Sequence, residues 1–149
     1  MLRIGKADYD LIRWEAERRY PQESVGIILG NLVEGERTVT LTVPCENAGQ
    51  DGVNKIHPEQ LVVALKLARS RSETVLGFYH SHPDQPTNLS STDLTEAHWF
   101  GCSYVITSVE RGHASTTDAY MLIGSEEHKK FQREEIQVVA NARPLGIAQ

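Results

Sequence analysis

Short apolar runs and apolar–polar alternation predict β-strands along much of the chain. Residues 24–32 form an apolar run rich in β-branched side chains, which indicates a buried strand. In residues 37–44, Val39, Leu41 and Val43 alternate with threonines, the two-residue period of a strand with one buried face. The same reasoning predicts strands at residues 74–82, 103–109 and 113–124.

The stretches between these strands show helical patterns. Residues 7–19 form a mixed amphipathic pattern that places Leu11 and either Ile12 or Trp14 on one face. Asp8 is suited to cap the start of this helix, and a proline at position 21 follows its end. We therefore expect a helix here, directly before the first predicted strand.

Two more helices are predicted further along the chain. Residues 58–72 begin with a proline, which fits a first helical turn. The apolar positions expected on the buried face of this helix are 61, 62, 65 and 68. Residues 91–100 form a shorter helix that Ser90 or Ser91 caps. Residues 126–139 are ambiguous, since they read as a charged helical turn that gives way to a last strand.

Helices and strands thus alternate, and this order predicts an α/β protein with a mixed sheet flanked by helices. The whole chain, residues 1–149, has the length of one domain with a real core. Residues 45–55 read as a polar loop, and residues 141–149 as a loosely held end.

Composition narrows the classes of partner. Apolar residues make up 40% of the chain and charged residues 23%, as in soluble globular proteins, and the net charge is −5. A nucleic-acid or anionic-membrane partner would call for a basic surface, so neither is expected. No apolar run reaches the roughly 20 residues that span a bilayer, and the start of the chain lacks the features of a signal peptide. We expect a cytoplasmic protein whose two cysteines are free thiols.

The stretch GFYHSHPDQPTNLSSTDL, residues 77–94, carries the chemistry. His80 and His82 lie two positions apart on a predicted strand, so both side chains point to the same face and can share one metal ion. Asp93, in the first turn of the next helix, can supply a third ligand and leave a fourth position open for water. A plainer interpretation remains open: two histidines end a strand, and Asp93 is an acid favoured at a helix start.

The spacing of these residues resembles that of a known family. Residues 80–83 read HSHP, seven residues separate His82 from Ser90, and two more separate Ser90 from Asp93. This string is similar to the motif H-[ST]-H-x7-S-x2-D of the JAMM (MPN⁺) metalloproteases. These enzymes also carry a glutamate in a context such as P-x-E-x-x-G-x-L-x-G, and here PQESVGIILG supplies Glu23 in that setting.

The resemblance implies a fold, a metal and a role for each residue. The fold would be a JAMM/MPN domain, related in architecture to cytidine deaminases. His80, His82 and Asp93 would bind one Zn²⁺ per chain. Glu23 would be the general base, and Ser90 would stabilise the oxyanion of the tetrahedral intermediate.

The resemblance also implies a substrate. Small prokaryotic members of the family hydrolyse amide or isopeptide bonds at the C-terminal Gly-Gly tail of ubiquitin-like sulfur-carrier proteins, so such a carrier is the expected partner. Residues 45–57 are a candidate wall of the substrate site, although their sequence departs from that of many small relatives.

Three other functions would each require particular sequence features. A non-catalytic MPN scaffold would usually lack a metal ligand, and a RadC-type protein associated with DNA metabolism would usually carry an N-terminal helix–hairpin–helix region. A zinc deaminase would need H-x-E and P-C-x-x-C, which do not occur in the sequence.

Several other residues are expected to have no part in the chemistry. Ser81 faces away from the two histidines, and Asp84 is interpreted as a turn residue. His98 is the exception: it follows Asp93 by five residues and could support the ligands from the same helix. His113 and His128 are assigned to the surface, and His57 is either structural or exposed at a helix start. The residues assigned to the core are Trp14, Trp99, Phe100 and Cys102.

Overall fold

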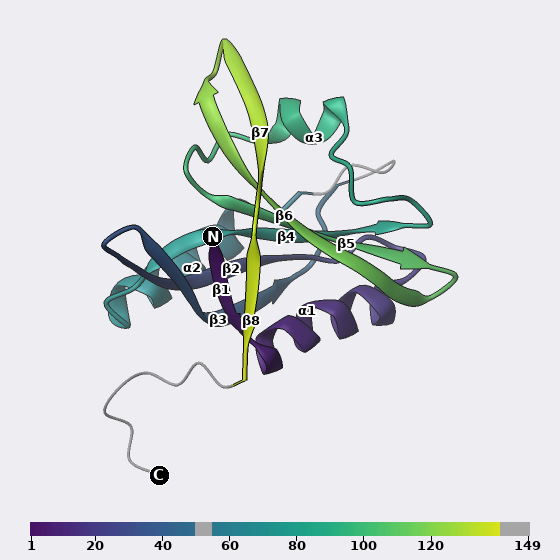
Figure 1. The fold of residues 1–149 in the computed structure, drawn as a ribbon, viewed down its shortest axis with the longest axis horizontal. Helices are drawn as coiled ribbons and strands as arrows, with labels where there is room; N and C mark the ends of the chain where they lie inside the picture. The colour runs from purple at the N-terminus through teal and green to yellow at the C-terminus, as the bar shows by residue number, and fades with distance from the viewer. Residues whose placement is uncertain (50–54, 141–149) are drawn as a thin grey trace.

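The computed structural model describes residues 1–49 and 55–140 of the chain. Helices and strands alternate along it, as Figure 1 shows. In chain order the elements are β1 (Leu2–Gly5), α1 (Lys6–Arg19), β2 (Val25–Val33), β3 (Glu36–Cys45), α2 (Pro58–Ser70), β4 (Thr74–Pro83), α3 (Ser91–Glu96), β5 (Ser103–Glu110), β6 (His113–Ser125), β7 (His128–Glu134) and β8 (Ile136–Val139).

The strands form one eight-stranded sheet in the order β7-β6-β5-β4-β2-β3-β1-β8. β4 is parallel to β5, and β1 is parallel to both β3 and β8, whereas the other neighbouring pairs are antiparallel. A mixed sheet with helices packed against it confirms the architecture expected from the sequence. β4 lies in the interior of the sheet, between β2 and β5.

The sheet is curled, because its two outermost strands follow one another in the chain. β7 pairs with β6 at one edge and β8 with β1 at the other, and only Glu135 separates them. In Figure 1 the two strands form a single long yellow run that crosses the front of the molecule. The amide of Leu2 donates to the carbonyl of Glu135 at 2.9 Å, which fixes the junction.

A buried ion pair closes the curled sheet at this junction. Nη1 of Arg37, on β3, donates to Oε2 of Glu134, on β7, at 2.8 Å, and both side chains are only 7% exposed. Arg37 also donates to the Leu76 carbonyl at 2.9 Å, and Ser103 bridges to both charged side chains. The cluster therefore ties together β3, β4, β5 and β7.

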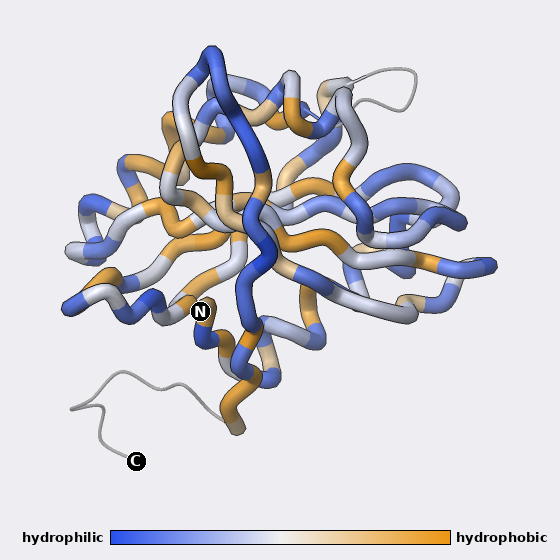
Figure 2. Tube along the Cα trace, turned by 45° about the horizontal axis from the view of Figure 1, so that its top comes forward, coloured by the Kyte–Doolittle hydropathy of each residue, from blue (hydrophilic) through white to orange (hydrophobic). Residues whose placement is uncertain are grey.

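Apolar side chains pack on both faces of the sheet. One core lies against α1, where Ile12 meets Ile28, Leu76 and Tyr79. The other lies against α2, where Ala64 and Ala68 meet Ile27 and Phe78, among others. In Figure 2 the hydrophobic segments lie mostly in the middle of the molecule and the hydrophilic ones mostly at its periphery.

Gly26 shows how close this packing is. It lies opposite Tyr79 in the β2–β4 pairing, and a Cβ there would lie 2.1 Å from the tyrosine ring. Only glycine leaves room for a fully buried tyrosine at this point of the sheet. Because Tyr79 precedes His80, this contact also sets the position of the end of β4.

The structure differs from the predicted elements in two places. The four-residue strand β1 was not predicted, since it is too short to show a period. The helical turn considered within residues 126–139 is wrong, because this stretch forms β7 and β8. In β7 the exposed and partly buried residues alternate as in a strand with one solvent face.

The predicted helices are present, but some of their details are wrong. Asp8 does not cap α1, since the cap position is Gly5 and Asp8 accepts a hydrogen bond from Thr42 instead. Trp14 is 54% exposed and Phe100 37% exposed, so neither belongs to the core. On α2, Val62 and Leu65 face solvent, and the buried residues are Ala64 and Ala68.

None of the helices in residues 1–49 and 55–140 combines the length and apolar character needed to cross a bilayer.

Candidate metal centre

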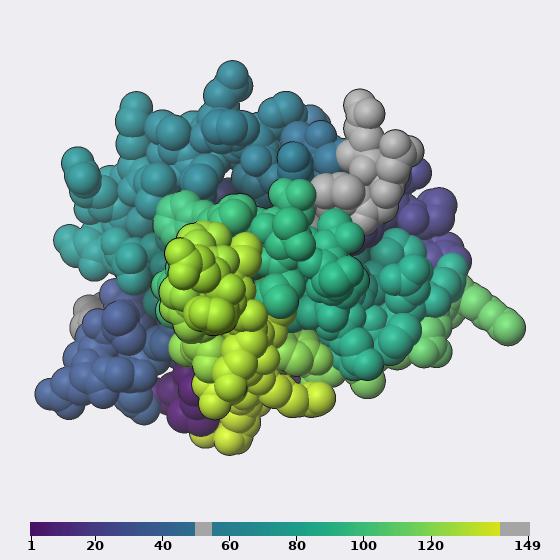
Figure 3. Space-filling view, turned by 90° about the horizontal axis from the view of Figure 1, so that it is seen from above, coloured from purple at the N-terminus to yellow at the C-terminus, as the bar shows by residue number. Residues whose placement is uncertain are grey.

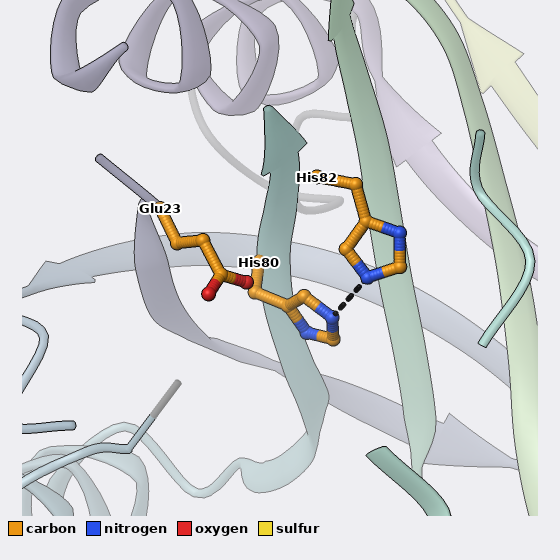
Figure 4. A group of neighbouring side chains, drawn as sticks. All are labelled: Glu23, His80 and His82. Carbon is orange, nitrogen blue, oxygen red and sulfur yellow. Dashed lines mark hydrogen bonds between the residues drawn. The ribbon is translucent and has the colours of Figure 1, made fainter. Parts of the chain in front are cut away.

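The two histidines of the sequence motif lie at the C-terminal end of β4. His80 and His82 point to the same face of the strand, because alternate residues of a strand share a face. Both side chains are buried, and their Nε2 atoms lie 3.1 Å apart. Figure 4 shows both rings and the carboxylate of Glu23 pointing into the same space.

The loop after β4 fixes the orientation of the second ring. β4 ends at Pro83, which pairs with Val109 of β5, and the amide of Asp84 makes one more bond to the Val109 carbonyl before the chain turns away. Four residues after His82, the carbonyl of Pro86 lies 2.8 Å from its Nδ1. Because a carbonyl can only accept, Nδ1 carries the proton and donates, so Nε2 is the atom that the neutral ring offers to a metal.

The start of α3 brings Asp93 to the two rings. Oδ1 of Asp93 lies 3.4 Å from Nε2 of His80, and Oδ2 lies 3.4 Å from Nε2 of His82. Ser90 is the cap residue of α3, and its Oγ accepts from the Asp93 amide at 3.0 Å. In return Oδ2 of Asp93 accepts from the amide of Ser90 at 2.8 Å and from its hydroxyl at 3.0 Å. This capping box holds the carboxylate in place.

Glu23 approaches the histidines from a different part of the chain. It lies two residues before β2, and its carboxylate and the two imidazoles offer atoms that all lie within 4.8 Å of one another. The structure thus brings together all five residues singled out from the sequence. His80 and His82 come from β4, Asp93 and Ser90 from the start of α3, and Glu23 from the segment before β2.

The distances among three of these groups fit a zinc ion. Ligand atoms about 2.0–2.1 Å from a tetrahedral Zn²⁺ lie about 3.3 Å from one another. Here the two Nε2 atoms lie 3.1 Å apart, and each lies 3.4 Å from one oxygen of Asp93, which is Oδ1 for His80 and Oδ2 for His82. Two imidazoles and a carboxylate are also donors that Zn²⁺ accepts, so the residues fit the metal that the family resemblance implies.

The electrostatics of the cluster favour the metal-binding forms of two of these groups. Burial lowers the pKa of His80, which keeps its ring neutral. Burial alone would raise the pKa of Asp93, but its hydrogen bonds with His80 and His82 hold it far below the usual range. Burial also works to lower the pKa of His82, yet the contacts with Asp93 and the Pro86 carbonyl raise it. A metal ion that binds His82 therefore competes with a proton.

A cavity of about 210 Å³ opens beside His80. Its lining is largely apolar and aromatic, from Ile56 and Leu61 on the α2 side to Trp99 after α3. The Phe78 ring also lines it, and its centroid lies 5.4 Å from that of Trp99 and 5.7 Å from that of Tyr104. Figure 3 shows this side of the molecule, where α2 and the residues around α3 face each other.

This cavity was missed by the reasoning from sequence. Trp99 was assigned to the core, but it is partly exposed and lines the cavity. Residues 45–57 were expected to form a substrate wall, and Lys55 and Ile56 of that segment do line the cavity. Residues 50–54 lie outside the described residues. The signal that could have found the cavity is the set of aromatic residues on β4, on β5 and after α3.

The residues set aside from the sequence lie mostly where expected. His57, His113 and His128 are exposed, and both cysteines are free, with burial raising the pKa of the Cys45 thiol to about 11. Asp84 is a turn residue with a φ of 54°, and it accepts hydrogen bonds from Tyr20 and from the amide of Arg111.

His98 lies beyond the end of α3, not on it as predicted, because the helix stops at Glu96. Its Nδ1 pairs with Oε1 of Glu126 at 3.0 Å, and its side chain is 58% exposed.

Comparison with known proteins agrees with this geometry. The family described as prokaryotic homologs of the JAB domain matches residues 6–138. The chain belongs to this family.

Two curated relatives are similar to this JAB-domain protein over part of its length. A desampylase from Haloferax volcanii is 34% identical over 90 residues, which cover 59% of this chain and 63% of the relative. A Thermus thermophilus protein named "Probable TtuB-protein conjugate cleaving protease" is 33% identical over 84 residues, 55% of this chain and 53% of the relative. The chain thus covers less than two thirds of either relative.

A solved structure of a protein from Desulfitobacterium hafniense shares the fold. Its TM-score is 0.82 at 24% identity, over 95% of this chain and 94% of that one.

Proposed function

We propose that this protein is a zinc-dependent metallopeptidase that cleaves the amide or isopeptide bond after the C-terminal Gly-Gly tail of a ubiquitin-like sulfur-carrier protein. The observation that carries the proposal is the convergence of His80, His82 and Asp93, at 3.1–3.4 Å, with Glu23 beside them. The names of the two curated relatives support the reaction class, since one is a desampylase and the other a conjugate-cleaving protease.

His80, His82 and Asp93 are assigned as the ligands of one Zn²⁺ per chain. Asp93 is preferred to Glu23 as the third ligand because its two oxygens each lie 3.4 Å from one imidazole Nε2. When bound, the ion supplies a Lewis acid that lowers the pKa of water to about 7 and polarises a carbonyl oxygen. The Pro86 carbonyl and the capping box keep His82 and Asp93 in the orientations this role needs.

Glu23 is assigned as the general base. Its carboxylate lies within 4.8 Å of the histidine nitrogens but comes from a separate segment, so it can accept a proton from the attacking water at the edge of the ligand cluster. It then returns this proton to the nitrogen of the leaving amine. The hydroxyl of the water thus ends on the carbonyl carbon of the carrier tail, and its proton ends on the nitrogen of the released amine. The C–N bond is thereby hydrolysed.

Ser90 is assigned as the donor to the oxyanion. In the structure its hydroxyl donates to Oδ2 of Asp93 at 3.0 Å, so the hydroxyl hydrogen has to rotate away from this carboxylate toward the substrate oxygen. An oriented donor of this kind contributes about 2.7–4 kcal/mol to transition-state stabilisation in other enzymes.

A Gly-Gly tail suits the surroundings of the cluster. His80 and His82 are buried, so a peptide bond reaches them only if its backbone approaches closely, which residues without a Cβ allow. The apolar cavity beside His80 can take a neighbouring side chain of the substrate. The acidic net charge of −5 gives no support to the RadC-type alternative, and the complete ligand set gives none to a non-catalytic scaffold.

The test is to incubate the purified protein with carriers that end in Gly-Gly followed by one or more further residues, and to weigh the carriers by mass spectrometry. We expect loss of the residues beyond the second glycine, about one zinc per chain in the active protein, and no cleavage after treatment with a chelator. A carrier whose second tail glycine is replaced by valine is the matched control and should stay intact. Cleavage that survives removal of all bound metal would overturn the proposal.

A further inference from the structure

Ser81 lies between the two histidines in the sequence, but its side chain points to the opposite face of β4, which we call the hidden face. Its side chain is fully buried, and its Oγ accepts a hydrogen bond from the amide of Ser24 at 2.8 Å. The amide of Ser81 in turn donates to the carbonyl of Ser24 at 3.1 Å. Both backbone polar groups of Ser24 are therefore bonded to the same residue.

These two bonds hold a segment that the sheet itself does not hold. The regular pairing of β2 with β4 ends at Val25 and His80, and Ser24 and Glu23 lie just before β2 begins. Without the Ser81 hydroxyl, the buried Ser24 amide would lose its acceptor, and an unsatisfied buried donor is unfavourable. The side chain of Ser24 forms no compensating bond, since its buried Oγ has no hydrogen-bond partner among the described residues.

We propose that Ser81 is a positioning residue for Glu23. This inference rests on the proposed function, in which Glu23 is the general base. A hydroxyl on the hidden face of β4 fixes the backbone next to Glu23, while His80 and His82 point from the same three-residue segment to the open face. The distance between the base and the metal ligands is thus set within one short piece of β4, by contacts that no substrate touches.

The test uses a matched pair of variants at this position. Ser81→Thr keeps the hydroxyl, and the motif that the sequence resembles accepts threonine here. Ser81→Val has nearly the same shape as the threonine variant but lacks the hydroxyl. Ser81→Ala removes the hydroxyl without added bulk. We expect kcat to fall about tenfold to a hundredfold in the Val and Ala variants, since small displacements of a catalytic group have effects of this size. KM and zinc content should stay within twofold of the wild type, and the Thr variant should retain most of the kcat.

Thr107 provides a control for a purely structural effect. It is the neighbour of Ser81 on β5, it is fully buried, and its hydroxyl lies 3.0 Å from that of Thr117. Thr107→Val removes a buried hydroxyl at the same level of the sheet, but this hydroxyl bonds to Thr117 on β6 and not to the backbone of Ser24. We expect it to lower stability and to leave kcat within twofold of the wild type.

A second readout is independent of activity and of metal. In the metal-free protein, hydrogen exchange of the Ser24 amide, followed by NMR, should be at least tenfold faster in Ser81→Ala and Ser81→Val than in the wild type and Ser81→Thr. Unchanged exchange would show that the bond is not formed, and faster exchange with an unchanged kcat would show that it does not position Glu23. A wild-type protein that cleaves no Gly-Gly-tailed carrier would instead contradict the proposed function, while the exchange result would stand.

Discussion

The molecule buries two polar clusters at opposite ends of β4, and they differ in composition. At the start of β4, Arg37 and Glu134 neutralise each other, and Leu76 and Ser103 bond to the guanidinium. At the end of β4, two imidazoles meet the carboxylates of Asp93 and Glu23. The first cluster joins β3 to β7, whereas the second collects side chains around one point.

The difference shows how a buried polar cluster can be assigned to structure or to chemistry. In the Arg37 cluster Nη1 and Nη2 of Arg37 and the Ser103 hydroxyl all donate to acceptors within the cluster, and these bonds hold the curled sheet closed. In the histidine cluster, acceptor atoms from three separate segments face the same point, which is the arrangement of a cation site. We therefore expect changes in the two clusters to affect different measurements.

The largest effect on catalysis is expected from Glu23→Gln. Glutamine keeps the shape of the side chain but cannot accept the proton of the attacking water, so kcat should fall about 10²–10⁴-fold. Zinc content, measured by metal analysis, should remain about one per chain. Glu36→Gln, at an exposed acid that begins β3, is the control and should keep kcat within twofold. A wild-type kcat in the Glu23 variant would show that Glu23 is not the general base.

The next largest effect is expected from Asp93→Asn, and it should appear in metal binding. Asparagine can still accept the Ser90 hydrogen bonds that cap α3, so the fold should be preserved while the charge is lost. Zinc affinity, measured by competition with a chelating dye, should fall by more than roughly 100-fold. That is the upper end of the loss seen when a residue hydrogen-bonded to a metal ligand is changed. Asp84→Asn, in the loop between the histidines and α3, should bind zinc as the wild type does. Equal affinity of the Asp93 variant would rule Asp93 out as a ligand.

The smallest effect on catalysis is expected from Arg37→Ala, which should act on stability. Removal of one partner of a buried ion pair lowers the free energy of unfolding by about 3–5 kcal/mol, because the other charge stays buried. Urea denaturation should detect this loss, while zinc content at low temperature should be unchanged. Lys6→Ala, which breaks the exposed pair with Asp10, should cost less than about 1 kcal/mol. A loss of zinc in the Arg37 variant without unfolding would mean that the two clusters are coupled.

The sequence predicted the strands around the site well, because they are long and apolar. The strands expected at residues 24–32, 37–44 and 74–82 match β2, β3 and β4 within one or two residues. β7 was ambiguous since it is an outer strand with many charged side chains, and Phe131 is its one apolar residue. On α2 the small residues Ala64 and Ala68 face the sheet, which hydrophobicity alone did not indicate.

The candidate site was predictable only where its residues are close in the sequence. His80, His82, Ser90 and Asp93 are linked by strand and helix periods, so their convergence follows from local geometry. Glu23 lies 57 residues before His80, and only the family resemblance connected the two. The bond between Ser24 and Ser81 has no local signal at all, because it depends on how β2 pairs with β4.

The curled sheet has a consequence for how copies of the protein meet at high concentration. Free strand edges can recruit strands from other molecules and so start aggregation. Here the two outer strands are seven and four residues long and are joined end to end. β7 also carries Lys129, Lys130 and Arg133. The positive charge of the β7 edge and the four-residue length of the β8 edge both oppose the growth of an intermolecular β-sheet.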